Sequence, residues 1–148
     1  MRVETYSDLY FLDVVNLVRQ FHTEAVGEYD PGFNADALIE TIKSEGAANP
    51  GNCFLMIVDG TCQGILYGAR LKSVVSGKEM FQEVIWYVNE THRRHGVRLL
   101  REVENTLQSQ GVSIMIMAVL ENSKTEKLKD FYERIGYKKI ETHYSRIL

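Results

Sequence analysis

The chain has 148 residues, of which 45% are hydrophobic and 25% are charged, and its formal net charge is −3 at pH 7. This composition is typical of a folded globular protein, and we expect one domain over residues 1–148. The acidic balance argues against non-specific nucleic-acid binding as the main function. No apolar run reaches about 18 residues and no signal-peptide core follows Met1, so the sequence predicts a cytoplasmic protein without a membrane partner.

The first third of the chain predicts an edge strand, a helix, a loop, a second helix and a buried strand. These elements are expected at residues 2–6, 9–21, 21–33, 34–45 and 53–58. Ser7 and Asp8 offer an N-cap for the first helix. Asn34 or Asp36 is expected to start the second helix, which should end before Gly46.

The rest of the chain predicts three strands, two helices and a final strand or hairpin. The strands are expected at residues 61–73, 79–88 and 112–120, the helices at 96–110 and 124–135, and the final element at 137–147. The order β-α-α-β-β-β-α-β-α-β predicts a mixed α/β sheet. Residues 79–120 should form a right-handed strand–helix–strand crossover, whose helix starts at the carboxyl ends of the strands, where ligands bind in such sheets.

The two cysteines are predicted to be buried and free. A two-residue hairpin turn at residues 59–60 would place Cys62 opposite Ile57 and Cys53 opposite Leu66. The two sulfur atoms would then lie on the order of 13 Å apart, which is beyond the reach of a disulfide.

Residues 89–98 combine a polar turn, a run of cations and one glycine ahead of an amphipathic helix. The apolar positions of that helix are Val97, Leu100, Val103 and Leu107. A helix N-terminus already carries partial positive charge, so Arg93, Arg94 and Arg98 are unfavourable there unless an anion binds against the amides. The pattern therefore predicts a phosphate-binding turn. The alternative is a solvated basic helix start, with arginines paired to Glu90, Glu102 and Glu104.

Two segments resemble the GCN5-related N-acetyltransferases (GNAT). Arg93-x-x-Gly96-x-Arg98 is similar to their acyl-CoA-binding signature Gln/Arg-x-x-Gly-x-Gly/Ala, with Arg98 in place of the small third residue. Residues 131–141, FYERIGYKKIE, are similar to the family's C-terminal signature Tyr-x-x-x-Gly-Phe/Tyr. The resemblance implies a mixed, mostly antiparallel central sheet flanked by helices.

The resemblance also implies an activity. An acetyl-CoA-dependent N-acetyltransferase would transfer an acetyl group to a primary amine by direct attack in a ternary complex, without a metal. The alternative is a regulatory or inactive module that binds acyl-CoA.

The resemblance implies a set of coenzyme-binding residues around the cationic turn. They are Tyr87, Val88, Arg93, Arg94, His95, Gly96, Val97, Arg98 and Asn122. The end of the strand at residues 87–89 would lie alongside the pantetheine arm. The family often has an asparagine seven residues before its C-terminal tyrosine, where this chain has Thr125, so Asn122 is the candidate for that contact.

Glu83 is the candidate general base. It is the acid within the apolar strand segment FQEVIWYV, and strand alternation places it on the face of Ile85 and Tyr87, opposite Trp86. Burial would raise its pKa toward the working range of a base. Its place ten residues before Arg93 is similar to that of the catalytic glutamate in histone-type family members. The alternatives are an ordinary solvent-facing carboxylate, or Glu79 or water as the base.

Tyr132 is the candidate general acid, because it falls on the tyrosine that protonates the coenzyme thiolate in the family. A phenol has an ordinary pKa above that of a thiol, so it is suited to this step. The alternative is a tyrosine that only packs in the core.

The resemblance implies an acceptor pocket in the 21–33 loop and the second helix, with Glu24, Glu28 and Tyr29 as candidate residues. Acidic and aromatic side chains together suit a cationic amine. The alternative is a solvated loop with a hydrophobic anchor. The histidines and cysteines lack metal-ligand spacing, so no metal is expected. The final strand offers an edge through which two copies could form a homodimer.

Overall fold

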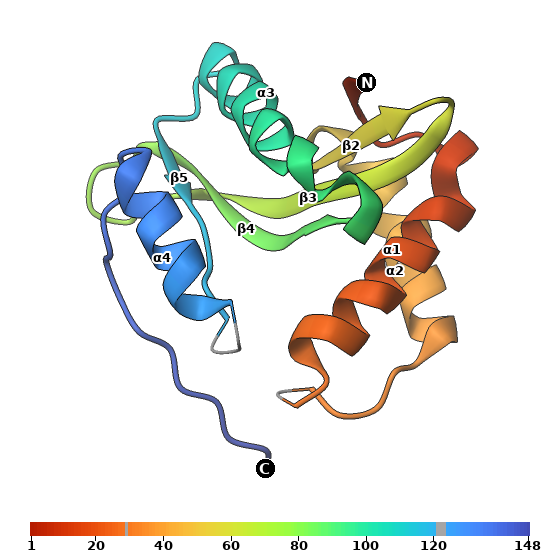
Figure 1. Ribbon diagram of the computed structural model, residues 1–148. Coiled ribbons are helices and arrows are strands. Elements are labelled where there is room, and N and C mark those ends of the chain that lie inside the picture. The colour runs from red at the N-terminus through yellow and green to blue at the C-terminus, as the bar shows by residue number, and fades with distance from the viewer. Residues whose placement is uncertain (29, 121–123) are drawn as a thin grey trace.

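The computed structural model describes residues 1–28, 30–120 and 124–148. Within these residues one five-stranded sheet has the order β1-β2-β3-β4-β5 (Figure 1). The strands are β1 (Arg2–Thr5), β2 (Cys53–Val58), β3 (Thr61–Lys72), β4 (Glu79–Val88) and β5 (Ile114–Ile116). Neighbours from β1 to β4 are antiparallel, and β5 is parallel to β4. The prediction of a mixed, mostly antiparallel sheet is confirmed.

Helices cover both faces of this sheet. They are α1 (Phe11–Phe21), α2 (Ala35–Ala48), α3 (Gly96–Ser109) and α4 (Thr125–Arg134). One hydrophobic cluster packs α1 and α2 on one face and includes Leu55, and a second packs α3 and α4 on the other face and includes Phe54. These adjacent residues of β2 belong to different clusters because side chains alternate across a strand. In Figure 1, α1 and α2 accordingly lie apart from α3 and α4.

Predicted caps start the first two helical segments. Ser7 Oγ accepts a hydrogen bond from the Leu9 N–H at 3.4 Å, at the start of a short helical turn, Asp8–Tyr10, that leads into α1. Asn34 Oδ1 accepts one from the Ala37 N–H at 3.0 Å at the start of α2. Both predictions are confirmed.

Two expectations in this region are wrong. The predicted loop begins with a π-helical turn, His22–Val26, that extends α1. Helix α2 continues through Gly46 to Ala48. A Cβ atom at Gly46 would lie 2.6 Å from a ring carbon of Tyr6, so this glycine permits close packing inside the helix and does not end it.

The hairpin between β2 and β3 is confirmed, with a one-residue correction. Asp59 and Gly60 have φ angles of 50° and 83°, as a tight two-residue turn requires. Cys62 pairs with Ile57 as expected, but the register then shifts and Cys53 pairs with Tyr67 instead of Leu66. The shift leaves one extra residue in β3, a β-bulge. Both cysteines are buried and free, as predicted.

The C-terminal part has less strand than expected. β5 covers only three residues of the predicted strand 112–120, and the predicted final strand at 137–147 is absent from the described residues. Helix α4 does end before Gly136, whose φ angle is 102°. Residues 138–148 are exposed, and in Figure 1 this tail extends past α4 without joining the sheet.

Within the described residues, no helix has both the length and the apolar character that a membrane crossing requires.

Candidate active site

A β-bulge in the middle of β4 organises the site. The pairing with β3 shifts so that Val84 has no partner across the ladder. The extra residue reverses the alternation of side chains along the strand. Phe81 and Trp86 therefore both pack in the cluster under α3 and α4, whereas Ile85 and Tyr87 pack in the cluster under α1.

Glu83 lies just before this bulge, two residues after Phe81 and on the same face. The prediction that it shares the face of Ile85 and Tyr87 is therefore wrong, because strand alternation was counted through the bulge. The side chain is not a solvent-facing carboxylate, since only 8% of the residue is exposed. Its Oε2 atom accepts a hydrogen bond of 2.9 Å from the backbone N–H of Ala118, which follows β5.

The environment of Glu83 changes its acidity. Burial raises the pKa of the carboxyl to about 7, although the backbone amides of Ala118 and Trp86 act in the opposite direction. A carboxyl with this pKa is partly ionised at neutral pH, so it can accept a proton in one step and release it in the next.

Tyr132, on α4, brings a second buried polar group to this face. The residue is 6% exposed and belongs to the cluster under α3 and α4. Its hydroxyl oxygen is buried and has no hydrogen-bond partner among the described residues. Burial raises the pKa of the phenol, and the nearby charge of Glu83 raises it further. The hydroxyl therefore keeps its proton and remains an unused donor.

The ladder between β4 and β5 ends close to these two side chains. β5 pairs only with Met80, Phe81 and Gln82 of β4. From Glu83 to Val88 the outer edge of β4 has no partner strand among the described residues. Main-chain groups on such an edge can pair with an extended ligand. Tyr87 and Val88, two predicted coenzyme-binding residues, lie on this part of the strand.

The cationic turn leads directly into α3. A short helical turn, Glu90–His95, is capped by Asn89, whose Oδ1 accepts a hydrogen bond of 3.3 Å from the Thr91 N–H. Helix α3 then begins at Gly96 with no acidic residue in its first turn and no side-chain cap. The partial positive charge of this helix start is thus not neutralised by its own turn, which is the setting in which helices bind anions.

The inward side of α3 differs from the prediction at one position. Leu100, Val103 and Leu107 are buried as expected, but Val97 is 45% exposed and Leu99 takes its place in the core. Val97 lies six residues before Val103, about 240° around an ideal helix, whereas Leu99 lies four residues before Val103 and shares its face.

The arginines of the turn make exposed contacts that a ligand can replace. Arg98 pairs with Glu102 at 3.7 Å, and Arg93 lies 3.9 Å from Glu90. The Arg94 Nε atom lies 3.2 Å from His95 Nε2. Two of the three arginines, Arg93 and Arg98, are therefore paired with neighbouring glutamates, as the alternative interpretation of a solvated basic turn predicts. Exposed pairs of this kind contribute about 1 kcal/mol or less, so they do not prevent phosphate binding.

Gly96 is not required by the fold at its position. A Cβ atom built there would meet Trp86 and Val88 at 3.7 Å, which is an ordinary contact. Its φ angle of −57° is also accessible to any residue. Neither packing nor backbone conformation therefore accounts for a glycine at this position.

Glu24 joins the cationic turn to the α1 side of the sheet. The Tyr87 hydroxyl donates a hydrogen bond of 2.6 Å to Glu24 Oε1, and Arg93 donates one to Oε2. The Lys124 ammonium lies 3.7 Å from the same carboxylate. Partial burial alone would raise the pKa of Glu24, but the hydrogen bond from Tyr87 and the charges of Arg93 and Lys124 together lower it. Glu24 is therefore ionised and already held by donors.

The other predicted binding residues are less informative. Glu28 is exposed near the end of the π-helical turn. Tyr29 and Asn122 lie outside the described residues. Thr125 Oγ1 donates a hydrogen bond of 2.9 Å to the Leu120 carbonyl oxygen, so it helps to fix the start of α4.

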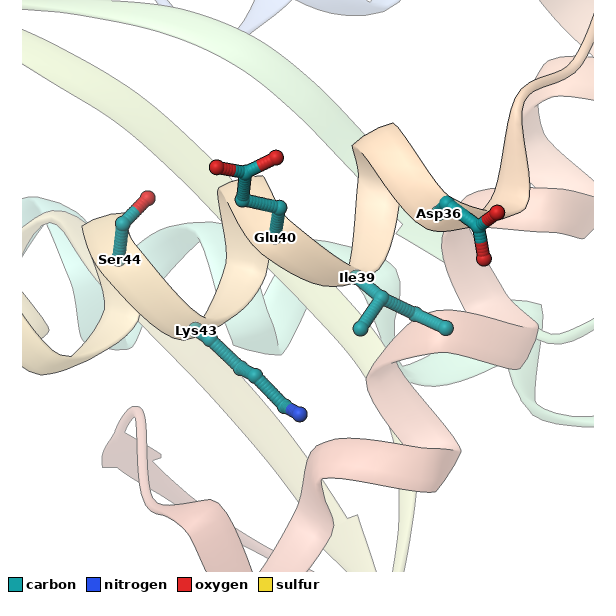
Figure 2. Close-up of a pocket in the computed structure, with 5 residues that line it drawn as sticks. All are labelled: Asp36, Ile39, Glu40, Lys43 and Ser44. Carbon is teal, nitrogen blue, oxygen red and sulfur yellow. The ribbon is translucent and has the colours of Figure 1, made fainter.

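An open depression lies on α2, apart from all these groups (Figure 2). Its lining consists of Asp36, Ile39, Glu40, Lys43 and Ser44. It lies on the second helix, which belongs to the predicted acceptor region, but its lining includes none of the candidates Glu24, Glu28 and Tyr29. Among the described residues, no group of three or more histidine, cysteine, aspartate or glutamate side chains is placed to hold a metal ion.

The comparison with protein families identifies the chain. Residues 57–147, more than half of its length, match the family described as FR47-like protein. The chain belongs to this FR47-like family. The family is part of the GNAT superfamily of acetyltransferases, which confirms the family predicted from the two sequence segments.

Solved structures of several acetyltransferases share the fold. A ribosomal-protein-alanine N-acetyltransferase from Brucella melitensis biovar Abortus 2308 has a TM-score of 0.75 at 15% identity, over 99% of this chain and 98% of that one. An aminoglycoside acetyltransferase from an uncultured soil metagenomic sample, in complex with trehalose, has a TM-score of 0.72 at 16% identity, over 99% and 95%. An acetyltransferase from Trypanosoma brucei has a TM-score of 0.67 at 15% identity, over 99% of both chains. No curated protein matches the sequence.

Proposed function

We propose that this FR47-like protein is an acetyl-CoA-dependent N-acetyltransferase that uses direct transfer to a primary amine in a ternary complex. The main support is a buried carboxyl and a buried phenol on the same face of the sheet, beside the open edge of β4. The phenol has no hydrogen-bond partner among the described residues. Glu83 is partly ionised near neutral pH and can accept a proton, and Tyr132 keeps a hydroxyl proton that it can donate.

Acetyl-CoA would supply the acetyl group as a thioester. Glu83, in its carboxylate form, accepts a proton from the acceptor ammonium, so that the amine nitrogen has a free electron pair for attack on the thioester carbonyl carbon. As the carbon–sulfur bond breaks, Tyr132 donates its hydroxyl proton to the leaving sulfur. The nitrogen loses its second proton as the amide forms, and this proton restores the Tyr132 hydroxyl, while Glu83 releases the first proton to solvent. An ordinary primary ammonium has a pKa near 10.4, so the base works in a favourable direction only when the amine is desolvated on binding.

The two cysteines support direct transfer over an acyl-enzyme route. Cys53 and Cys62 are both buried, and burial raises the pKa of each thiol to about 12. A thiol in this state is a poor nucleophile. Both also belong to the cluster under α1, on the opposite side of the sheet from Tyr132.

The residues of the cationic turn fit the diphosphate of the coenzyme. The amides at the start of α3 and the side chains of Arg94 and Arg98 would hold the phosphate oxygens, and Gly96 would let the phosphates approach the backbone. Arg93 would contribute after exchanging its contact with Glu24. The open edge of β4 at Val88 would then pair with the amide groups of the pantetheine arm.

The acceptor is a primary amine that carries positive charge in its free form. Glu24 remains the leading candidate to bind it, with Glu28 and Tyr29 nearby in sequence. Glu24 already receives hydrogen bonds from Tyr87 and Arg93, so an amine must replace one of these donors. The identity of the amine is left to a screen.

The experiment combines calorimetric titration with acetyl-CoA and a thiol-release assay over a panel of amines. Glu83→Gln and Tyr132→Phe should each lower turnover by about 10²–10⁴-fold while the Kd for acetyl-CoA stays within a factor of about two. Glu79→Gln is the matched control, because this carboxylate lies on the same strand but is exposed and pairs with Lys72 at 3.4 Å.

The outcomes separate the two candidate functions. Absence of acetyl-CoA binding by the intact protein would reject the proposal. Tight binding without turnover on any amine would favour the regulatory or inactive acyl-CoA-binding module. Turnover that is unchanged in both the Glu83 and the Tyr132 variants would reject the assigned roles.

A further inference from the structure

Trp86 buries an indole N–H that makes no hydrogen bond within the described residues. It is the only tryptophan of the chain. A buried tryptophan N–H normally finds a partner, and an unpaired one destabilises the fold. Leucine or phenylalanine would fill the same core position without this penalty, so the packing of β4 does not explain the indole.

The ring stands between the two parts of the candidate site. Its Cζ2 atom, beside the ring carbon that carries the N–H nitrogen, would lie 3.7 Å from a Cβ atom built on Gly96. The N–H side of the ring is therefore directed toward the start of α3. The same ring also lies beside α4, since its centroid is 6.0 Å from that of Tyr132 and 6.1 Å from that of Phe131.

A carrier held by its phosphates at Gly96, with its sulfur at Tyr132, must pass this indole. The pantetheine arm of coenzyme A is a mostly apolar chain that carries two amide carbonyl oxygens, which are hydrogen-bond acceptors. Trp86 and Tyr132 contribute the two buried side-chain groups that lack a partner among the described residues, and they lie side by side. One of them has a role in the proposed reaction, and the other has none.

We infer that Trp86 is a coenzyme-binding residue whose indole N–H donates a hydrogen bond to an amide carbonyl of the pantetheine arm. The inference rests on the proposed function, because it assumes that acyl-CoA is the carrier. It assigns to Trp86 a role in affinity for the carrier arm, separate from the phosphate contacts of the cationic turn.

The test compares two ligands and two variants by calorimetry. Acetyl-CoA has the pantetheine arm, whereas adenosine 3′,5′-bisphosphate has only the nucleotide end. Trp86→Phe keeps an aromatic ring without the donor, and we expect it to weaken acetyl-CoA binding by about threefold to tenfold. Its affinity for the bisphosphate should equal that of the intact protein. Phe131→Leu, a change in the neighbouring ring that removes no donor, should leave both affinities within a factor of about two.

The fluorescence of the unmodified protein gives an independent measurement, since Trp86 is its sole indole. Acetyl-CoA should change the Trp86 emission with the same Kd that calorimetry measures, and this result does not depend on the folding of any variant. Acetyl-CoA binding with no change in emission, or an equal loss of affinity for both ligands in Trp86→Phe, would overturn the inference alone. Failure of acetyl-CoA to bind at all would overturn the proposed function and the inference together.

Discussion

Replacing Glu83 with glutamine should remove a strong pH dependence from the free energy of unfolding. Burial raises the pKa of this carboxyl from its ordinary 4.5 to about 7 in the folded protein. The folded state therefore holds the proton more tightly than the unfolded chain does. The stability that this proton provides is complete below pH 4.5, is lost as the pH rises, and is gone above about pH 7. At about 1.36 kcal/mol per pKa unit, the loss amounts to roughly 3 kcal/mol.

Glutamine is a close replacement for the protonated form of Glu83. Its side-chain oxygen can still accept the hydrogen bond from the Ala118 N–H, and it carries no charge at any pH. Compared with the wild-type protein, Glu83→Gln should gain roughly 2–3 kcal/mol of relative stability between about pH 5 and about pH 8. Urea unfolding at several pH values measures this difference, provided that the slope against urea concentration is the same for both proteins.

Glu79→Gln is again the control, because it makes the same change on the same strand at a side chain that is 43% exposed. A stability difference for Glu83→Gln that does not change with pH would mean that the Glu83 carboxyl ionises freely in the folded protein. That result would contradict its burial and would remove the reason to regard it as a general base.

Three further changes have clear expected results. Gly96→Ala should fold with unchanged or higher thermal stability, because the contacts of its Cβ atom would be ordinary. The variant should nevertheless bind acetyl-CoA several-fold more weakly in calorimetry. An unchanged Kd would contradict a contact between the backbone and the phosphates. Tyr132→Phe should be at least as stable as the wild-type protein in urea unfolding, because it removes a buried hydroxyl that has no hydrogen-bond partner among the described residues. A decrease of more than about 1 kcal/mol in the free energy of unfolding would show that the hydroxyl has a partner. Cys53 and Cys62 should react with a thiol reagent only in denaturant, and fast reaction of the native protein would contradict their burial and raised pKa values.

Features that depend on neighbouring residues were predictable from the sequence. Ser7 and Asn34 cap helical segments because a short polar side chain can reach the free backbone N–H groups just after it. The turn at residues 59–60 and the end of α4 at Gly136 follow from backbone angles that aspartate and glycine tolerate. In each case the physical cause lies within a few residues of its effect.

Features that depend on distant contacts were not predictable. A glycine at position 46 predicts the end of a helix, but Gly46 instead makes room for the ring of Tyr6, which lies forty residues earlier in the chain. The alternating residues at 137–147 read as a strand, but alternation does not supply a neighbouring strand with which to pair. Arg93 occupies a recognisable motif position, so the sequence identifies it. Its contact with Glu24 joins residues far apart in the chain, and no nearby residue indicates it.

The candidate site combines both kinds of feature. The motif positions located Glu83 and Tyr132, and the structure brings both to the side of the sheet under α3 and α4. Trp86 has no sequence signal of a binding role, because a sequence does not show whether a buried indole has a hydrogen-bond partner. Its N–H has no hydrogen-bond partner among the described residues, and this signal exists only in the folded protein.

The bulge at Val84 determines whether these residues can act together. In a regular strand, Glu83 would share a face with Tyr87, and Trp86 would lie on the other face with α4. The proposed base would then be separated from Tyr132 by the sheet itself, and the two proton transfers would take place in different environments. One unpaired residue changes the register so that Glu83, Trp86 and Tyr132 lie on one face. The proposed chemistry therefore depends on this local irregularity of β4 as much as on the identity of the side chains.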